Sequence, residues 1–198
     1  MNICFMMRHI RDMKNSRVHM TDRKGSGDRR RQKMIPRYRI HVAPLKCMFY
    51  RESAVYDMNH CAGILCSSDF GQITENIPFR YYVKMEFQDT CDPTDGNAFK
   101  LEQAEEIARF ISGLPAEITD LVIACDAGCS RSPAIAAALL RASGRSDKTI
   151  WVNPRYYPNP LVYERVCKAL GLLTPKMMIS YKVRVNRMAY RKIQRNHD

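Results

Sequence analysis

Cys125 and Arg131 are the residues of this sequence whose types and spacing point most directly to chemistry. They lie six positions apart within LVIACDAGCSRSPAIAAALL, residues 121–140. A cysteine thiolate is a strong nucleophile, and the planar guanidinium group of arginine can hydrogen-bond two phosphate oxygens at once. The pair therefore predicts a site in which a cysteine attacks a phosphate group that an arginine holds. A buried thiol that only ends a core strand is the competing interpretation of Cys125.

The five residues between this pair form a predicted phosphate-binding loop. Their main-chain N–H groups can curl around an anion, and Gly128 permits the tight turn. The N-terminus of the following helix adds unpaired N–H donors, which favour an anion and a thiolate alike. Ser132 stands where its hydroxyl can donate a hydrogen bond to that thiolate. We expect phosphate to be bound by Asp126, Ala127, Gly128, Cys129, Ser130 and Arg131.

The elements that would position this loop alternate between strands and helices. Alternating or continuous apolar residues predict strands, and apolar residues three and four apart predict helices. This order predicts an α/β domain of three layers, with a largely parallel central sheet flanked by helices. Such sheets bind ligands at the carboxyl ends of their strands. The predicted strands are 37–45, 62–68, 79–89 and 120–125, and the predicted helices are 101–114, 132–144 and 159–173.

The net charge of +12 belongs to the two ends of the chain. Residues 1–33 hold ten basic and three acidic residues, and residues 174–198 hold seven and one, whereas residues 34–173 hold fifteen and sixteen. We therefore predict a domain that carries the cysteine-dependent chemistry over 34–173 and a basic C-terminal tail over 174–198. Solvated tails are the simplest interpretation of these ends, although contact with an anionic surface or nucleic acid is the alternative.

Residues 1–33 have no apolar period, which indicates a disordered or extraneous extension. Two adjacent arginine codons at 30–31 can read AGGAGG, a sequence typical of a bacterial ribosome-binding site, so we expect the native chain to begin at Met34.

The remaining composition restricts the location and the cofactors of the protein. No apolar stretch is long enough to span a membrane, and basic residues interrupt the N-terminus too early for a secretory signal. We therefore expect a cytoplasmic protein whose eight cysteines are reduced. No Cys-x-x-Cys pair suggests a zinc site. We predict no metal and no cofactor, because the arginine and the loop amides do the work that a metal would do.

The run CDAGCSRSP resembles the signature loop of the dual-specificity branch of the protein tyrosine phosphatases, and the resemblance extends over about 35–173. It implies that Cys125 is the nucleophile, that Arg131 binds phosphate and that Ser132 assists the breakdown of a phosphocysteine intermediate. The implied activity is hydrolysis of a phosphomonoester on a phosphorylated protein or peptide. Downstream, YYPNPLVYERV resembles a turn and helix of the same family, in which Asn159 would be structural.

The resemblance also implies an aspartate that acts as general acid, about thirty residues before the nucleophile. The segment FQDTCDPTD offers Asp89, Asp92 and Asp95. Asp89 directly follows the predicted strand and matches the family pattern best, with Asp92 as the alternative. At least two of the three should be ordinary turn-capping residues.

Two residues depart from the family pattern or add to it. Ala124 occupies the position where the family usually has a histidine that favours the thiolate, which leaves reduced activity open. Cys129 could form a protective disulfide after oxidation of the loop, or could simply be a small side chain that points away from the phosphate.

Two alternatives to a protein phosphatase therefore stay open. One is the same chemistry on inositol phosphates or RNA 5′ phosphates, and the other is a catalytically impaired phosphate-binding module.

Overall fold

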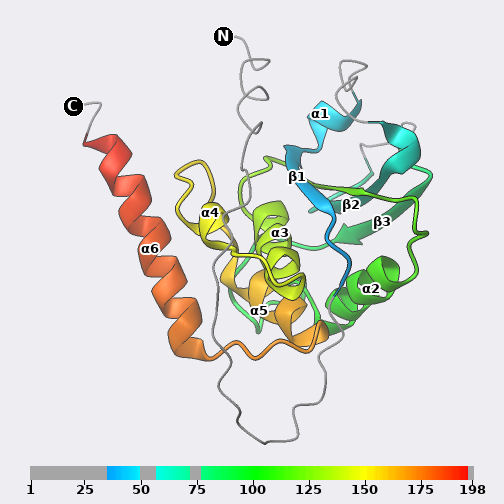
Figure 1. Cartoon of the computed structure of the whole chain (residues 1–198). Coiled ribbons are helices and arrows are strands. Elements are labelled where there is room, and N and C mark those ends of the chain that lie inside the picture. The colour runs from blue at the N-terminus through cyan, green and yellow to red at the C-terminus, as the bar shows by residue number, and fades with distance from the viewer. Residues whose placement is uncertain (1–34, 50–56, 72–76, 196–198) are drawn as a thin grey trace, which may run out of the picture. The chain divides into compact units, whose positions relative to one another are not determined.

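The computed structural model describes residues 35–49, 57–71 and 77–195, which form a parallel sheet covered by helices (Figure 1). The predictions for residues 1–33 and for the start at Met34 lie outside the described residues. Within the described ranges, no helix has the length and the apolar character needed to cross a bilayer.

The sheet has four parallel strands in the order β1-β4-β2-β3. Every residue of β4 and β2 is buried, which explains why LVIAC and CAGILCS are continuous runs of apolar or small residues. The edge strand β3 instead alternates buried and exposed residues. The predicted α/β class with a parallel central sheet is therefore confirmed. The bounds are β1 Arg39–Pro44, β2 Cys61–Ser67, β3 Tyr81–Glu86 and β4 Asp120–Cys125.

The longer helices pack mainly against one face of the sheet. Ile64 and Ile123 of the central strands meet Ile135 and Leu139 of α3 in this core. The opposite face is covered by apolar side chains of the connecting segments, such as Phe79. The helices are α1 Lys46–Phe49, the 3₁₀ helix Met58–His60, α2 Leu101–Ser112, α3 Arg131–Ala142, α4 Lys148–Trp151, α5 Pro160–Ala169 and α6 Lys176–Gln194.

The segment predicted as a basic C-terminal tail contains α6, which contacts the rest of the domain. Lys182 donates hydrogen bonds of 2.7 Å to both carboxylate oxygens of the buried Asp147. The same carboxylate accepts hydrogen bonds from the Tyr163 hydroxyl and the Trp151 indole N–H, at 2.8 and 3.2 Å. Because one charged group satisfies three donors, this network fixes α6 against α4 and α5.

Candidate active site

The predicted phosphate-binding loop lies at the carboxyl edge of the sheet, between the end of β4 and the start of α3. Gly128 has a φ of 70°, and its N–H donates to the carbonyl oxygen of Cys125 at 3.1 Å. A β-carbon at Gly128 would lie 2.6 Å from the main-chain nitrogen of Pro44, so both the conformation and the space require glycine. Among the described residues, the N–H groups of Ala127 and Ser130 donate to no main-chain acceptor. The loop therefore presents unpaired donors, as an anion-binding loop must.

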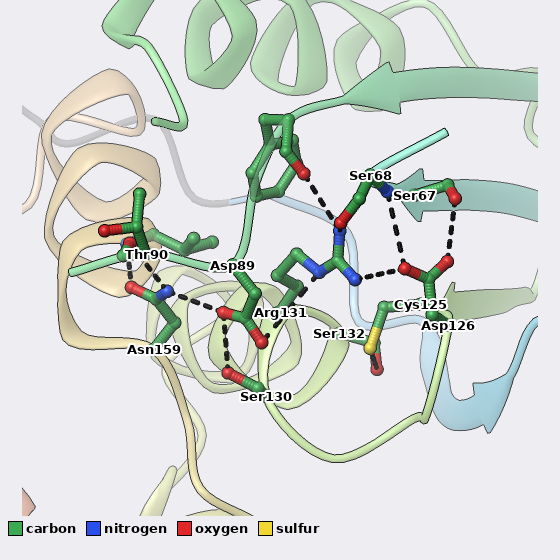
Figure 2. Close-up of polar contacts among 12 residues, drawn as sticks. Ser67, Ser68, Asp89, Thr90, Cys125, Asp126, Ser130, Arg131, Ser132 and Asn159 are labelled. Atoms are coloured by element: carbon green, nitrogen blue, oxygen red, sulfur yellow. Dashed lines mark hydrogen bonds and ion pairs between the residues drawn. The ribbon is translucent and has the colours of Figure 1, made fainter. Parts of the chain in front are cut away.

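Cys125 lies at the base of this loop, where only 2% of its surface is exposed. Its Sγ is 3.0 Å from the Oγ of the buried Ser132, in the first turn of α3 (Figure 2). A hydroxyl at this distance can donate a hydrogen bond to a thiolate. The structure thus brings together the two residues whose spacing suggested a nucleophile and its stabilising partner.

Arg131 is buried, with 4% of its surface exposed. Hydrogen bonds hold its guanidinium group in one orientation. Its Nη1 donates to the Ser68 hydroxyl at 3.0 Å and to the Phe87 carbonyl oxygen at 2.9 Å, and its guanidinium group lies 5.6 Å from the centre of the Phe87 ring. Its Nη2 donates to Oδ2 of Asp126 at 2.5 Å. Its Nε is buried and has no hydrogen-bond acceptor among the described residues. This donor is available to an oxyanion of a ligand.

The Asp126 side chain has a role that the sequence did not suggest. We expected this residue to contribute only its place in the loop, but its carboxylate also accepts hydrogen bonds from the Ser67 hydroxyl at 2.7 Å and the Ser68 N–H at 3.4 Å. Burial opposes ionisation of Asp126, but the hydrogen bonds from Ser67 and Arg131 and the charge of Arg131 outweigh it and lower its pKa. The sequence shows the serine pair that ends the predicted strand 62–68, but only the pairing of β2 with β4 places these serines beside the Cys125 loop.

Of the three candidate general acids, Asp89 is the one that contacts the predicted phosphate-binding loop. Its Oδ1 accepts a hydrogen bond from the Ser130 hydroxyl at 2.9 Å, and its Oδ2 is 4.0 Å from Nε of Arg131. Asp92 instead accepts hydrogen bonds from the hydroxyl and the N–H of Thr94, which lower its pKa. Asp95 accepts from a main-chain N–H two residues later. Asp92 and Asp95 are thus turn-capping residues.

Asn159, which the resemblance marked as structural, connects the acidic loop to α5. Its Oδ1 accepts hydrogen bonds from the N–H groups of Leu161 and Val162 and so caps the N-terminus of α5. Its Nδ2 donates to Oδ1 of Asp89 at 2.8 Å and to the carbonyl oxygen of Thr90 at 3.0 Å (Figure 2). The residue therefore also positions Asp89 beside the loop, which sequence spacing could not indicate.

The thiols near Cys125 are free, as are all seven cysteines of the described residues. Burial is the main cause of the raised pKa of Cys129, and negative charge at Cys125 and Asp89 adds to it. Cys66 is the register partner of Cys125 on the neighbouring strand, and burial raises its pKa strongly. A protective disulfide at Cys129 stays a prediction.

No protein-family model and no curated protein sequence matches this chain. Among solved structures, the human tyrosine phosphatase-like serine/threonine/tyrosine-interacting protein is similar at 13% identity with a TM-score of 0.45, over 81% of this chain and 99% of that chain. The active form of Tk-PTP is similar at 15% identity with a TM-score of 0.40, over 79% of this chain and 95% of that chain. Likenesses this distant do not define an activity, so the functional argument depends on the residues of the site.

Proposed function

We propose that this chain is a cysteine-dependent phosphomonoester hydrolase that acts on phosphotyrosine, and also on phosphoserine or phosphothreonine, in proteins or peptides. The observation that carries the proposal is the arrangement around Arg131. Its guanidinium group is buried and oriented by three acceptors, while its Nε has no acceptor in the described part of the chain. Cys125 with its serine partner lies on one side of this group, and Asp89 lies on the other.

The first step transfers the phosphoryl group to the enzyme. The thiolate of Cys125 attacks phosphorus, the S–P bond forms and the bond from phosphorus to the substrate oxygen breaks. Asp89 in its acid form donates its proton to that leaving oxygen. Arg131 and the loop amides bind the non-bridging oxygens, whose charge they stabilise in the transition state.

The second step hydrolyses the phosphocysteine intermediate. Asp89, now a carboxylate, accepts a proton from water as the water oxygen attacks phosphorus. The S–P bond breaks, and Ser132 donates a hydrogen bond to the departing thiolate at the 3.0 Å separation of the two side chains. Inorganic phosphate then leaves, and the same chemistry would apply to an inositol phosphate or an RNA 5′ phosphate.

A phosphate-binding module without turnover is the second candidate, because specific features favour it. Two carboxylates, Asp89 and Asp126, lie beside the single guanidinium group and offset its charge. Ala124 provides no polar group next to the nucleophile, and Cys125 is almost completely buried.

Hydrolysis of a chromogenic aryl phosphate by the wild type and by Cys125→Ser distinguishes the two candidates. The hydrolase proposal predicts turnover by the wild type and none by the variant. If the wild type is inactive while Cys125→Ser still retains a phosphopeptide, the chain is a binding module. Relative turnover of a phosphotyrosine peptide, a phosphothreonine peptide, an inositol phosphate and a 5′-triphosphate RNA then defines the substrate class.

A further inference from the structure

A groove of about 710 Å³ lies between the start of α5 and one side of α6. Its apolar lining includes Pro160, Val183 and Met188. The polar part of the lining consists of Ser180 and three exposed arginines on successive turns of α6, at positions 184, 187 and 191. We call this feature the α6 groove. An apolar floor beside a row of guanidinium groups suits a ligand that is both acidic and partly apolar.

The positive charge of the α6 groove is not offset by the protein. Helix α6 contains no Asp or Glu, and no carboxylate in the described ranges forms an ion pair with any of its three groove arginines. A second depression beyond Pro160 is nearly balanced, since four basic and three acidic residues line it. The basic excess therefore marks the α6 groove in particular as a surface for anionic groups.

The α6 groove ends next to the candidate active site. Pro160 directly follows Asn159, whose side chain holds Asp89 and whose N–H donates to the carbonyl oxygen of Ser130 at 3.3 Å. A ligand in the groove thus lies beside the loop that would bind its phosphate.

Direct hydrogen bonds fix α6 relative to that loop. Asn186 of α6 is buried and donates to the carbonyl oxygens of Trp151 and Tyr156, at 3.1 and 2.8 Å. The next residue, Tyr157, donates its N–H to the carbonyl oxygen of Cys129 at 2.7 Å. The Tyr157 ring also packs edge-on against Tyr190 of α6, with ring centres 5.0 Å apart. The groove and the loop are therefore parts of one packed structure.

We propose that the α6 groove binds an acidic segment of a phosphopeptide substrate while the phosphorylated residue enters the Cys125 loop. This inference rests on the proposed function. Arg184 and Arg191 are seven positions apart and so lie about 10 Å from each other along the helix axis, which equals about three residues of an extended peptide. A cluster of about three acidic residues near the phosphorylated position matches that length. A single-stranded nucleic acid is a poorer match, because bases stack on aromatic rings and the described lining of the groove has none.

The test compares a phosphotyrosine peptide that carries three nearby glutamates with one that carries three glutamines. The variant R184Q/R187Q/R191Q removes the groove charge. The control R109Q/K148Q/K192Q removes the same charge from exposed positions that line neither depression. We expect the groove variant to lose about tenfold in kcat/KM on the glutamate peptide, through KM, since three exposed ion pairs are lost. Its hydrolysis of a small aryl phosphate and its melting temperature should match the wild type, and high salt should remove the difference.

Three results with the glutamate peptide would overturn the proposal. The groove variant could have the same kcat/KM as the wild type, the control variant could lose as much kcat/KM as the groove variant, or the wild type could show no preference for the glutamate peptide over the glutamine peptide. Faster hydrolysis of a 5′-phosphorylated oligonucleotide through the same arginines would also overturn it, in favour of a nucleic-acid site. If the wild type hydrolyses no aryl phosphate, the proposed function fails. In that case, fluorescence anisotropy measures the affinity of the labelled glutamate peptide for Cys125→Ser, with and without the groove substitutions. Weaker binding with the groove substitutions would show that the groove binds the peptide, and equal binding would overturn the proposal.

Discussion

Replacement of Asp89 by Asn tests whether Asp89 is the proton donor of the proposed reaction. The amide oxygen of asparagine can still accept the hydrogen bonds that Asp89 now accepts from Ser130 and Asn159, at 2.9 and 2.8 Å. Because these hydrogen bonds keep their partners and only the acceptor loses its charge, the free energy of unfolding should fall by about 1 to 2 kcal/mol. The amide has no acidic proton to donate, so kcat should fall by about 10²- to 10⁴-fold. That loss corresponds to about 3 to 5 kcal/mol of transition-state stabilisation.

The assay measures kcat for aryl phosphates whose leaving phenols differ in acidity. A weakly acidic phenol needs the proton from Asp89, whereas a strongly acidic phenol leaves without it, so the loss should be largest for the weakly acidic phenols. Asp92→Asn is the matched control, since Asp92 lies on the same loop and, among the described residues, its carboxylate accepts hydrogen bonds from Thr94 and not from the Cys125 loop. We expect Asp92→Asn to keep kcat within about twofold, as surface changes usually do.

Two results would refute this reasoning. One is a larger loss of kcat in Asp92→Asn than in Asp89→Asn, which would make Asp92 the acid after a loop movement. The other is a loss in Asp89→Asn that does not depend on the leaving phenol, which would make Asp89 a residue that only positions the loop.

Three further substitutions test the supports of the site. Asn159→Ala removes a helix cap and a hydrogen bond to a carboxylate, so urea denaturation should show that the free energy of unfolding falls by about 2 to 4 kcal/mol. A fall of less than about 1 kcal/mol would contradict the assigned contacts. Gly128→Ala places a β-carbon 2.6 Å from Pro44 and should lower the melting temperature more than Gly171→Ala, which has a φ of 72° but open space; equal losses would exclude the clash. The pKa of Asp126 is lowered, so its carboxylate stabilises the fold above its unfolded pKa of about 3.9. The stability advantage of the wild type over Asp126→Asn should therefore be full above pH 5 and disappear as the pH falls through the folded pKa, and a constant difference from pH 7 to pH 2 would disprove the link.

Helix α6 shows where the sequence was a poor guide to the fold. Its charged and polar residues suggested a solvated basic tail, but α6 packs through a few positions such as Ile179, Lys182 and Asn186. Lys182 and Asn186 are polar, and their partners lie about thirty residues earlier in the chain. A pattern of apolar residues cannot reveal contacts of this kind.

The sequence by itself determined the four strands, the helices α2, α3 and α5, and the loop that follows Cys125. Strand β4 and the loop from Cys125 to Arg131 were predicted at their observed positions, because burial imposes an apolar run on a central strand and because an anion-binding turn requires a glycine at Gly128. Only the tertiary structure showed that Asp89, rather than Asp92, contacts the loop. The same holds for the three acceptors that orient Arg131. These choices depend on contacts between residues 5 to 70 positions apart, and distance along the chain does not encode which side chains a folded sheet edge brings together.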